Sequence, residues 1–254
     1  MPIVDWLNQI ILLIVSLVAN AFSAFVGGGA GLLQLPALIF LGLSFSVALA
    51  THKVASVALG VGATVRHLRD DALERWFALY ILACGLPGVL LGATLILKVP
   101  DAIARTSLGL LTISLAIYSF LRPELGQNFA SKHRDLRGML IGGVVLLFIG
   151  VLNGSLTSGT GLFVTLWLVS WFGLDYKTAV AYTLVLVGVF WNGAGAVVLG
   201  VLGDIEWSWL PALIVGSLLG GYAGAHLSII KGNRFIKRMF ELITLLVGLK
   251  LVFF

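Results

Sequence analysis

The sequence predicts an all-α integral membrane protein built from two inverted repeats of five segments each. Hydrophobic residues make up 59% of the 254 residues and charged residues only 11%, whereas soluble domains carry about 25% charged residues. Apolar runs recur along the whole chain, and they are expected to be helices because lipid offers no partner for open backbone groups. The second half of the chain also repeats motifs of the first half.

Ten apolar segments are expected, in chain order 3–26, 31–44, 46–66, 75–97, 102–121, 137–153, 160–172, 177–200, 207–229 and 235–254. Eight are long enough to cross a hydrocarbon core of about 30 Å, which needs about 20 residues. The segments 31–44 and 160–172 reach only about 20 Å at 1.5 Å per residue. These two are therefore expected to be broken or re-entrant helices. The first segment is too long for a removable signal peptide and lacks its flanking regions.

The distribution of charge predicts the orientation in the membrane. Residues 66–75, 122–137 and 231–238 are rich in Lys and Arg, whereas 199–209 contains two acids and no Lys or Arg. The positive-inside rule places the three basic segments in the cytoplasm and the acidic segment outside. Counting the crossings then places both termini outside.

The two halves share motifs at a nearly constant offset. GGAGL at 28–32 matches SGTGL at 158–162, and FLGLSFSVALAT at 40–51 matches WFGLDYKTAVAY at 171–182. Each half contains five segments, an odd number, so the second half must enter the membrane in the opposite sense, as in many secondary transporters. The expected organisation is a first transmembrane repeat at 1–121, a cytoplasmic linker at 122–136 and a second, inverted repeat at 137–254.

Each short segment follows a cluster of glycines or hydroxyl residues. A helix that starts there directs backbone N–H groups and the positive end of its dipole into the protein, where they favour an anion. In inverted-repeat transporters, matching broken segments mark the substrate site. The residues predicted to bind the substrate here are Gly27, Gly28, Gly29, Gly31, Gln34, Asn153, Ser155, Thr157, Ser158, Gly159 and Thr160. The alternative is that small residues only allow close helix packing, which is preferred for Gly85, Gly88, Gly92, Gly216, Gly220 and Gly224.

His52 and Lys53 lie about two turns into the third segment, in ATHKVAS at 50–56. Ionisable side chains inside a membrane are costly and usually face a cavity or a partner. Lys53 is interpreted as the counter-charge of an anionic substrate, and His52 as a proton-coupling or hydrogen-bonding group, because histidine titrates near neutral pH. Alternatively, Lys53 snorkels to the outer interface about 10 Å away. Neighbouring or repeat-related polar residues are expected to complete the site: Thr51, Tyr182 and Thr183.

Two more polar residues lie within predicted spans. Asn192 either contacts the ligand or makes a hydrogen bond between helices. Glu241 lies about two turns into the last segment, where Arg238, Lys237 or Lys231 is expected to pair with it.

The sequence contains no sign of catalysis. HExxH, P-loop and CxxC motifs are absent, so no catalytic residue, metal site or cofactor is predicted, and energy must come from an ion or substrate gradient. The basic residues cluster in short loops, as topology requires, and do not indicate nucleic acid. The expected partners are a small anion, the lipid bilayer and a coupling proton or other ion, with a homo-oligomer left open.

The pattern GGGAGLLQLPALIFLGLSFSVALAT, followed by a span that ends in the basic stretch Arg66–Arg69, resembles the sulfite exporter TauE/SafE family. The resemblance covers nearly the whole chain and both halves. It implies a permease of a bacterial-type cytoplasmic (inner) membrane for small sulfur-containing anions such as sulfite or an organosulfonate. Ala50-Thr51-His52 and Ala181-Tyr182-Thr183 depart from the family pattern, so the resemblance supports a small anion better than it supports sulfite. An anion channel-like pore and a non-transporting accessory or assembly protein remain the alternatives to a carrier with alternating access.

Overall fold

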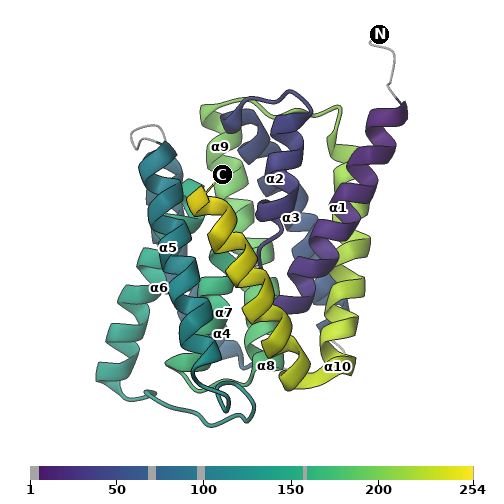
Figure 1. Ribbon diagram of the computed structural model, residues 1–254. Helices are drawn as coiled ribbons and strands as arrows, with labels where there is room; N and C mark the ends of the chain where they lie inside the picture. The colour runs from purple at the N-terminus through teal and green to yellow at the C-terminus, as the bar shows by residue number, and fades with distance from the viewer. Residues whose placement is uncertain (1–5, 68–72, 96–100, 157–158, 254) are drawn as a thin grey trace.

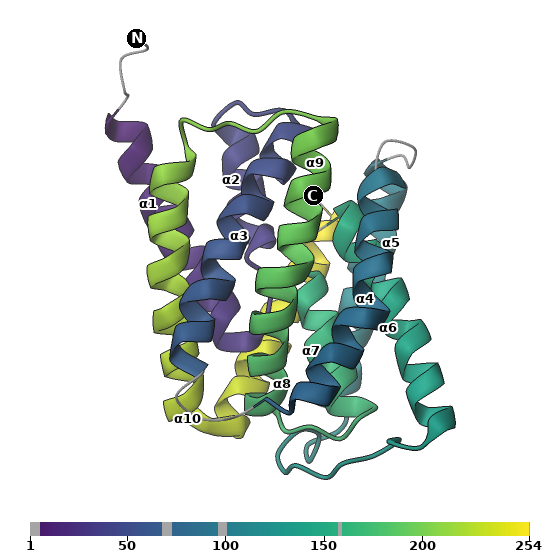
Figure 2. The same cartoon turned by 180° about the vertical axis from the view of Figure 1, so that it is seen from behind.

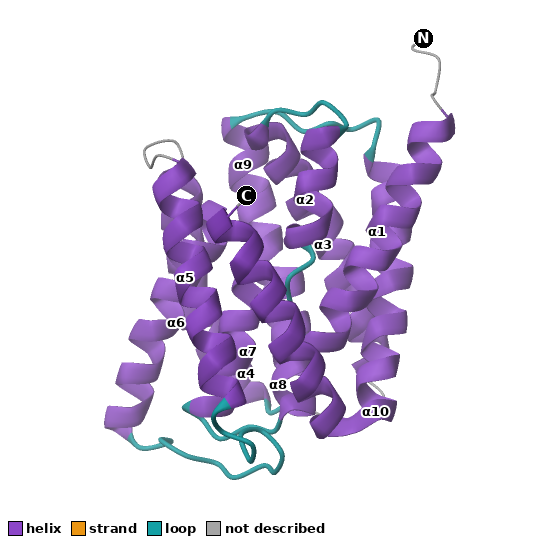
Figure 3. Cartoon of the chain, viewed as in Figure 1, coloured by secondary structure: helices purple, strands orange, loops and turns teal. Residues whose placement is uncertain are grey.

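The computed structural model describes residues 6–67, 73–95, 101–156 and 159–253. Helices and loops make up this described part, with no strand (Figure 3). The all-α prediction is confirmed. In chain order the helices are α1 (Trp6–Val26), α2 (Gly31–Phe40), α3 (Phe45–His67), α4 (Arg75–Leu95), α5 (Asp101–Phe120), α6 (Leu136–Leu156), α7 (Thr160–Ser170), α8 (Tyr176–Tyr182), the π-helix η3 (Thr183–Trp191), α9 (Asn192–Leu202) and α10 (Leu210–Phe253).

Six of the described helices are long and apolar enough to cross a membrane, with α8, η3 and α9 counted as one continuous span. The sequence predicts eight long segments. Two of these merge in α10, where Gly232 (φ 74°, ψ 172°) bends a single helical run of 44 residues. α5 is not among the six. The short helices α2 and α7 fall at the two positions where short segments are predicted.

α2 contains a proline whose effect is offset by a distant lysine. Pro36 has no backbone N–H, so the carbonyl of Leu32, four residues earlier, has no donor within the helix. Lys250 Nζ, from the last turn of α10, donates to this carbonyl oxygen at 3.4 Å. The helix then ends at Phe40, and Gly42 turns the chain with φ 109°.

Glycines let two helix pairs approach to backbone contact. A Cβ atom added to Gly88 of α4 would lie 2.1 Å from the carbonyl oxygen of Leu147 in α6. On the other side of the molecule, a Cβ on Gly220 of α10 would lie 2.5 Å from the carbonyl oxygen of Leu17 in α1. The predicted packing role of the isolated glycines is therefore confirmed for both pairs.

The basic parts of the chain gather at one end of the bundle. The end of α3, the start of α4, the linker between α5 and α6 and the bend of α10 all lie at the lower end in Figures 1 and 2. The loop between α9 and α10, which carries Asp204 and Glu206, lies at the upper end. This separation is the one that the charge pattern predicts.

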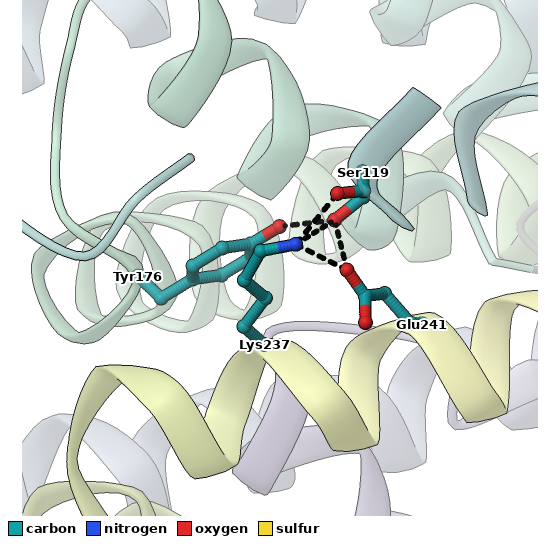
Figure 4. Close-up of polar contacts among 4 residues, drawn as sticks. All are labelled: Ser119, Tyr176, Lys237 and Glu241. Atoms are coloured by element: carbon teal, nitrogen blue, oxygen red, sulfur yellow. Dashed lines mark hydrogen bonds and ion pairs between the residues drawn. The ribbon is translucent and has the colours of Figure 1, made fainter. Parts of the chain in front are cut away.

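A buried polar cluster ties the second part of α10 to α5 and α8 (Figure 4). Lys237 forms an ion pair with Glu241 one turn later and donates to the carbonyl oxygen of Ser119 at 2.6 Å. Ser119 Oγ donates to the Glu241 carboxylate at 3.0 Å and lies 2.9 Å from the Tyr176 hydroxyl. Of the three bases predicted as partners of Glu241, Lys237 is therefore the one that pairs with it.

Candidate functional site

Two glycine-containing breaks interrupt the bundle at the starts of α2 and α7. Between α1 and α2, Gly27, Gly28 and Gly29 have φ values of 87°, 145° and 100°. Before α7, Gly159 has φ 77°. Residues with a Cβ rarely adopt these angles, so the glycines are what allow the chain to leave one helix and start the next inside the bundle.

The two breaks touch each other. A Cβ on Gly28 would lie 2.6 Å from the Cα of Gly161, and a Cβ on Gly161 would lie 2.9 Å from the Cα of Gly28. Thr165 of α7 donates from Oγ1 to the carbonyl oxygen of Gly27 at 2.8 Å. From this meeting point α2 occupies the upper half of the molecule and α7 the lower half (Figure 1). Neither helix start has a side-chain cap.

A cavity of about 40 Å³ lies at the meeting point. Because a buried water molecule needs about 10–15 Å³, the cavity has room for about three waters or one small oxyanion. Its polar lining comes from α1, α3, α6, α7, η3 and α9 and consists of Ser23, His52, Ser56, Asn153, Thr160, Thr183 and Asn192. Backbone of the two breaks and a few apolar side chains complete the wall: Gly28, Gly29, Ala30, Gly31, Gly161, Leu59, Leu184, Val187 and Gly188.

His52 is held at the cavity wall by hydrogen bonds on both ring nitrogens. Nδ1 lies 3.1 Å from Gln34 Oε1, and Nε2 lies 3.2 Å from Ser56 Oγ. Gln34 Oε1 can only accept, so Nδ1 carries a proton. Gln34 is itself fixed by Asn20 Nδ2, which donates to Oε1 at 3.2 Å, and by a bond from its Nε2 to Ser16 Oγ at 3.2 Å. The orientation of His52 is therefore set by a buried network that joins α1, α2 and α3.

Lys53 lies behind the cavity wall and supports Asn153. Its side chain is fully buried, and Nζ donates to the carbonyl oxygen of Asn153 at 2.9 Å and to Oδ1 at 3.3 Å. Asn153 Nδ2 in turn donates to Thr160 Oγ1 at 2.9 Å and lies 3.4 Å from Asn192 Oδ1. Among the described residues no carboxylate forms an ion pair with Lys53. The alternative that Lys53 snorkels to the interface is wrong, because none of its side chain is exposed.

The structure brings together about half of the predicted site residues. Those that line the cavity are Gly28, Gly29, Gly31, His52, Asn153, Thr160 and Thr183. Those that lie near it without lining it are Gly27, Gln34, Lys53 and Gly159. Ser155 donates to the carbonyl oxygen of Val151 in its own helix, as serines in helices often do. Thr157 and Ser158 lie outside the described residues.

Thr51 and Tyr182 lie on opposite sides of the cavity and do not line it. Thr51 Oγ1 accepts from the backbone N–H of Glu206 at 3.0 Å, in the loop at the upper end. The Tyr182 hydroxyl accepts from the backbone N–H of Glu74 at 2.7 Å, at the lower end. Thr51 and Tyr182 occupy the same position of the matched motifs FLGLSFSVALAT and WFGLDYKTAVAY. Each bond joins one half of the chain to the other.

Sequence reasoning missed Ser23, Ser56 and the π-helix η3. Ser56 follows His52 by four residues, and this spacing places the two side chains on the same helical face. Ser23 lies in the last turn of α1, where its carbonyl oxygen accepts from the N–H groups of Gly27 and Gly28 at 2.9 and 2.8 Å. The π-helix has no signature in the sequence; such segments are frequent at functional sites, and this one supplies four wall residues of the cavity.

Comparison with known proteins gives a consistent result. The sequence profile described as "Sulfite exporter TauE/SafE" matches residues 12–251. A "Probable membrane transporter protein" of Haemophilus influenzae is 30% identical over 96% of this chain and 94% of its own length. The "Probable membrane transporter protein YfcA" of Escherichia coli K12 is 27% identical over 96% of this chain and 89% of its own. The "Probable membrane transporter protein YunE" of Bacillus subtilis is 21% identical over 97% of this chain and 98% of its own length. No solved structure matches the chain.

Proposed function

The chain belongs to the sulfite exporter TauE/SafE family of membrane transporters, and on this premise we propose that it is a secondary transporter that carries a small sulfur-containing oxyanion by alternating access. The observation that carries this proposal is the meeting of two uncapped helix starts at one buried polar cavity. Irregular backbone at membrane depth is tolerated only inside protein or beside a cavity. A cavity of about 40 Å³ favours sulfite over larger organosulfonates.

The electrostatics of the cavity favour an anion. Two helix N-termini direct partial positive charge at it, and the ammonium of Lys53 lies one residue behind its wall. Burying an ammonium group without a carboxylate is expensive. An anion held near Asn153 and Thr160 offsets this cost, so the site is more stable with its ligand than without it.

The contacts of His52 suggest how a proton is coupled to the anion. While His52 is neutral, Ser56 must donate its hydroxyl proton to Nε2 and offers only lone pairs to the cavity. When His52 takes up a proton, Nε2–H donates to Ser56 instead, and the Ser56 hydroxyl becomes free to donate to an anion. Proton uptake and anion binding therefore favour each other, which is the linkage that a proton-coupled carrier requires.

His52→Gln is expected to remove the proton dependence of transport. An amide has no proton to gain, so an inward proton gradient should no longer change the sulfite flux, while some flux driven by the sulfite gradient remains. The measurement is uptake of radiolabelled sulfite into proteoliposomes with and without a pH gradient. Ser56→Ala, which keeps the histidine but removes its hydroxyl partner, is the matched comparison. A full pH response in His52→Gln contradicts the coupling role.

The two cross-repeat hydrogen bonds support an alternating mechanism. The bond from Glu206 N–H to Thr51 closes the upper side, and the bond from Glu74 N–H to Tyr182 closes the lower side. We propose that the cavity is closed from both sides when both bonds are formed. We infer that the two halves form an inverted repeat. In the transport cycle only one of the two hydrogen bonds breaks at a time, so the cavity opens to one side of the membrane and then to the other. The basic lower end is assigned to the cytoplasm and both termini to the outside, in a bacterial-type inner membrane.

Tyr182→Phe and Thr51→Val are expected to open opposite sides of the carrier. The readout is alkylation of a cysteine placed at Thr183, on the cavity wall, in a Cys84→Ser background by a membrane-impermeant reagent. Tyr182→Phe should raise the rate from the lower side and Thr51→Val from the upper side, because each removes the side-chain hydroxyl that bonds to the other half of the chain, at about 1 kcal/mol per hydrogen bond. Acceleration from the same side in both variants contradicts the gate assignment.

The function itself is tested by counterflow. Proteoliposomes loaded with unlabelled sulfite should accumulate external labelled sulfite transiently, with a rate that saturates. Flux without counterflow indicates a channel-like pore. The absence of flux with sulfite, sulfate, thiosulfate and sulfoacetate contradicts the proposed substrate class, and together with stable co-purification of a partner protein it indicates an accessory or assembly protein.

A further inference from the structure

A second cavity lies on the basic side of Tyr182. Its volume is about 280 Å³, and its polar lining consists of Glu74, Arg134, Thr178 and Tyr182. Tyr182 separates it from the central cavity, since the next residue, Thr183, lines that cavity. The second cavity and then Tyr182 therefore lie between Glu74, at the basic end of the molecule, and the central cavity.

Arg134 comes from the linker between α5 and α6 and is held over an aromatic ring. Its guanidinium carbon lies 3.5 Å from the centroid of Phe77 and 5.4 Å from that of Phe172. Such stacking fixes the orientation of the guanidinium plane. Arg134 Nε is buried and has no hydrogen-bond partner, and no carboxylate of the described residues forms an ion pair with the side chain.

The charge of Arg134 is therefore incompletely compensated. Burial lowers the pKa of its guanidinium, and the carboxylate of Glu74 acts in the opposite direction. Glu74 is exposed, so water screens its charge more strongly than that of the half-buried arginine. The guanidinium fork matches the geometry of an oxyanion, and the hydroxyl of Thr178 provides a further donor on the same wall.

We propose that this second cavity is a docking site for a small oxyanion, in which Arg134 and Thr178 hold the substrate before it passes Tyr182 to the central cavity. The proposal rests on anion transport as the function of the chain. It assigns the linker a role in substrate capture, because a fixed positive charge at the mouth of a path raises the local concentration of an anion and its rate of arrival.

Arg134→Gln is expected to raise the sulfite concentration at half-maximal flux by about 5–10-fold at low ionic strength, with the maximal rate retained. Initial rates are measured in proteoliposomes of neutral lipid, with sulfite supplied on the basic side. Arg137→Gln is the matched control, because Arg137 is an exposed arginine in the first turn of α6, three residues further along the chain, and it does not line the cavity. The difference should shrink in 0.5 M salt. Equal half-saturation in the two variants overturns the docking site.

A second readout does not depend on transport. Purified protein in detergent is heated with and without sulfite, and the rise in unfolding temperature caused by sulfite is compared between variants. A smaller rise in Arg134→Gln than in Arg137→Gln supports docking even if the chain carries no anion in the flux assay, and an equal rise overturns it. An Arg134-dependent rise with phosphatidylglycerol but not with sulfite also overturns it, because the anion bound is then a lipid headgroup.

Discussion

Gly28→Ala is expected to abolish sulfite flux, whereas Gly42→Ala is expected to leave most of it intact. Both glycines have positive φ, 145° and 109°, so each substitution strains the backbone by about 1–2 kcal/mol. The two differ in what the added methyl group meets. At Gly28 it lies 2.6 Å from the backbone of Gly161, whereas at Gly42 nothing lies within 4 Å. Only Gly28→Ala therefore forces the two helix starts apart.

The comparison separates strain from the geometry of the site. Flux per folded protein is measured in proteoliposomes, and folding is checked by the unfolding temperature and by elution as a single species. Gly29→Ala gives an intermediate case, because its methyl group meets the flexible side chain of Leu32 at 3.0 Å. We expect flux to fall in the order Gly42→Ala, Gly29→Ala, Gly28→Ala. Equal flux in Gly28→Ala and Gly42→Ala contradicts the idea that the contact between the breaks forms the site.

The breaks themselves could be predicted from the sequence because their cause is local. Gly27, Gly28 and Gly29 interrupt an apolar run, and the positive φ values found there are ones that a glycine cluster permits at little cost. The match between GGAGL and SGTGL placed a second break at Gly159 in the same way. Length and composition also indicated the helical class, since they depend on the chain and not on how its helices pack.

The arrangement of the side chains around the breaks could not be predicted in the same way. Gln34 and Lys53 have the polarity expected of ligand-binding residues, but they hold His52 and Asn153 in place. Which face of a helix meets a cavity depends on its rotation against partners that are distant in sequence. Arg134 contributed to the sequence analysis only as a charge that orients the linker, because its position over Phe77 depends on a contact between residues 57 positions apart.

Lys53→Met is expected to abolish sulfite flux without destabilising the ligand-free protein. Methionine fills a similar volume, and it removes an ammonium that is fully buried with no carboxylate partner among the described residues. Replacing a buried charge by an apolar side chain of similar size is often neutral or stabilising. The loss of the hydrogen bonds from Nζ to Asn153 lowers the stability and so partly cancels this gain. We therefore expect an unfolding temperature equal to or above that of the unmodified protein.

The response to sulfite distinguishes an electrostatic role of Lys53 from a structural one. A ligand at 100 times its dissociation constant stabilises the folded state by about 2.7 kcal/mol, and this stabilisation should be absent in Lys53→Met. Gly195→Ala is the matched perturbation, because its methyl group would lie 2.9 Å from Nζ and displace the ammonium without removing its charge. It should weaken sulfite binding and not abolish it. If Lys53 only supported Asn153, Lys53→Met would unfold at a lower temperature and still be stabilised by sulfite.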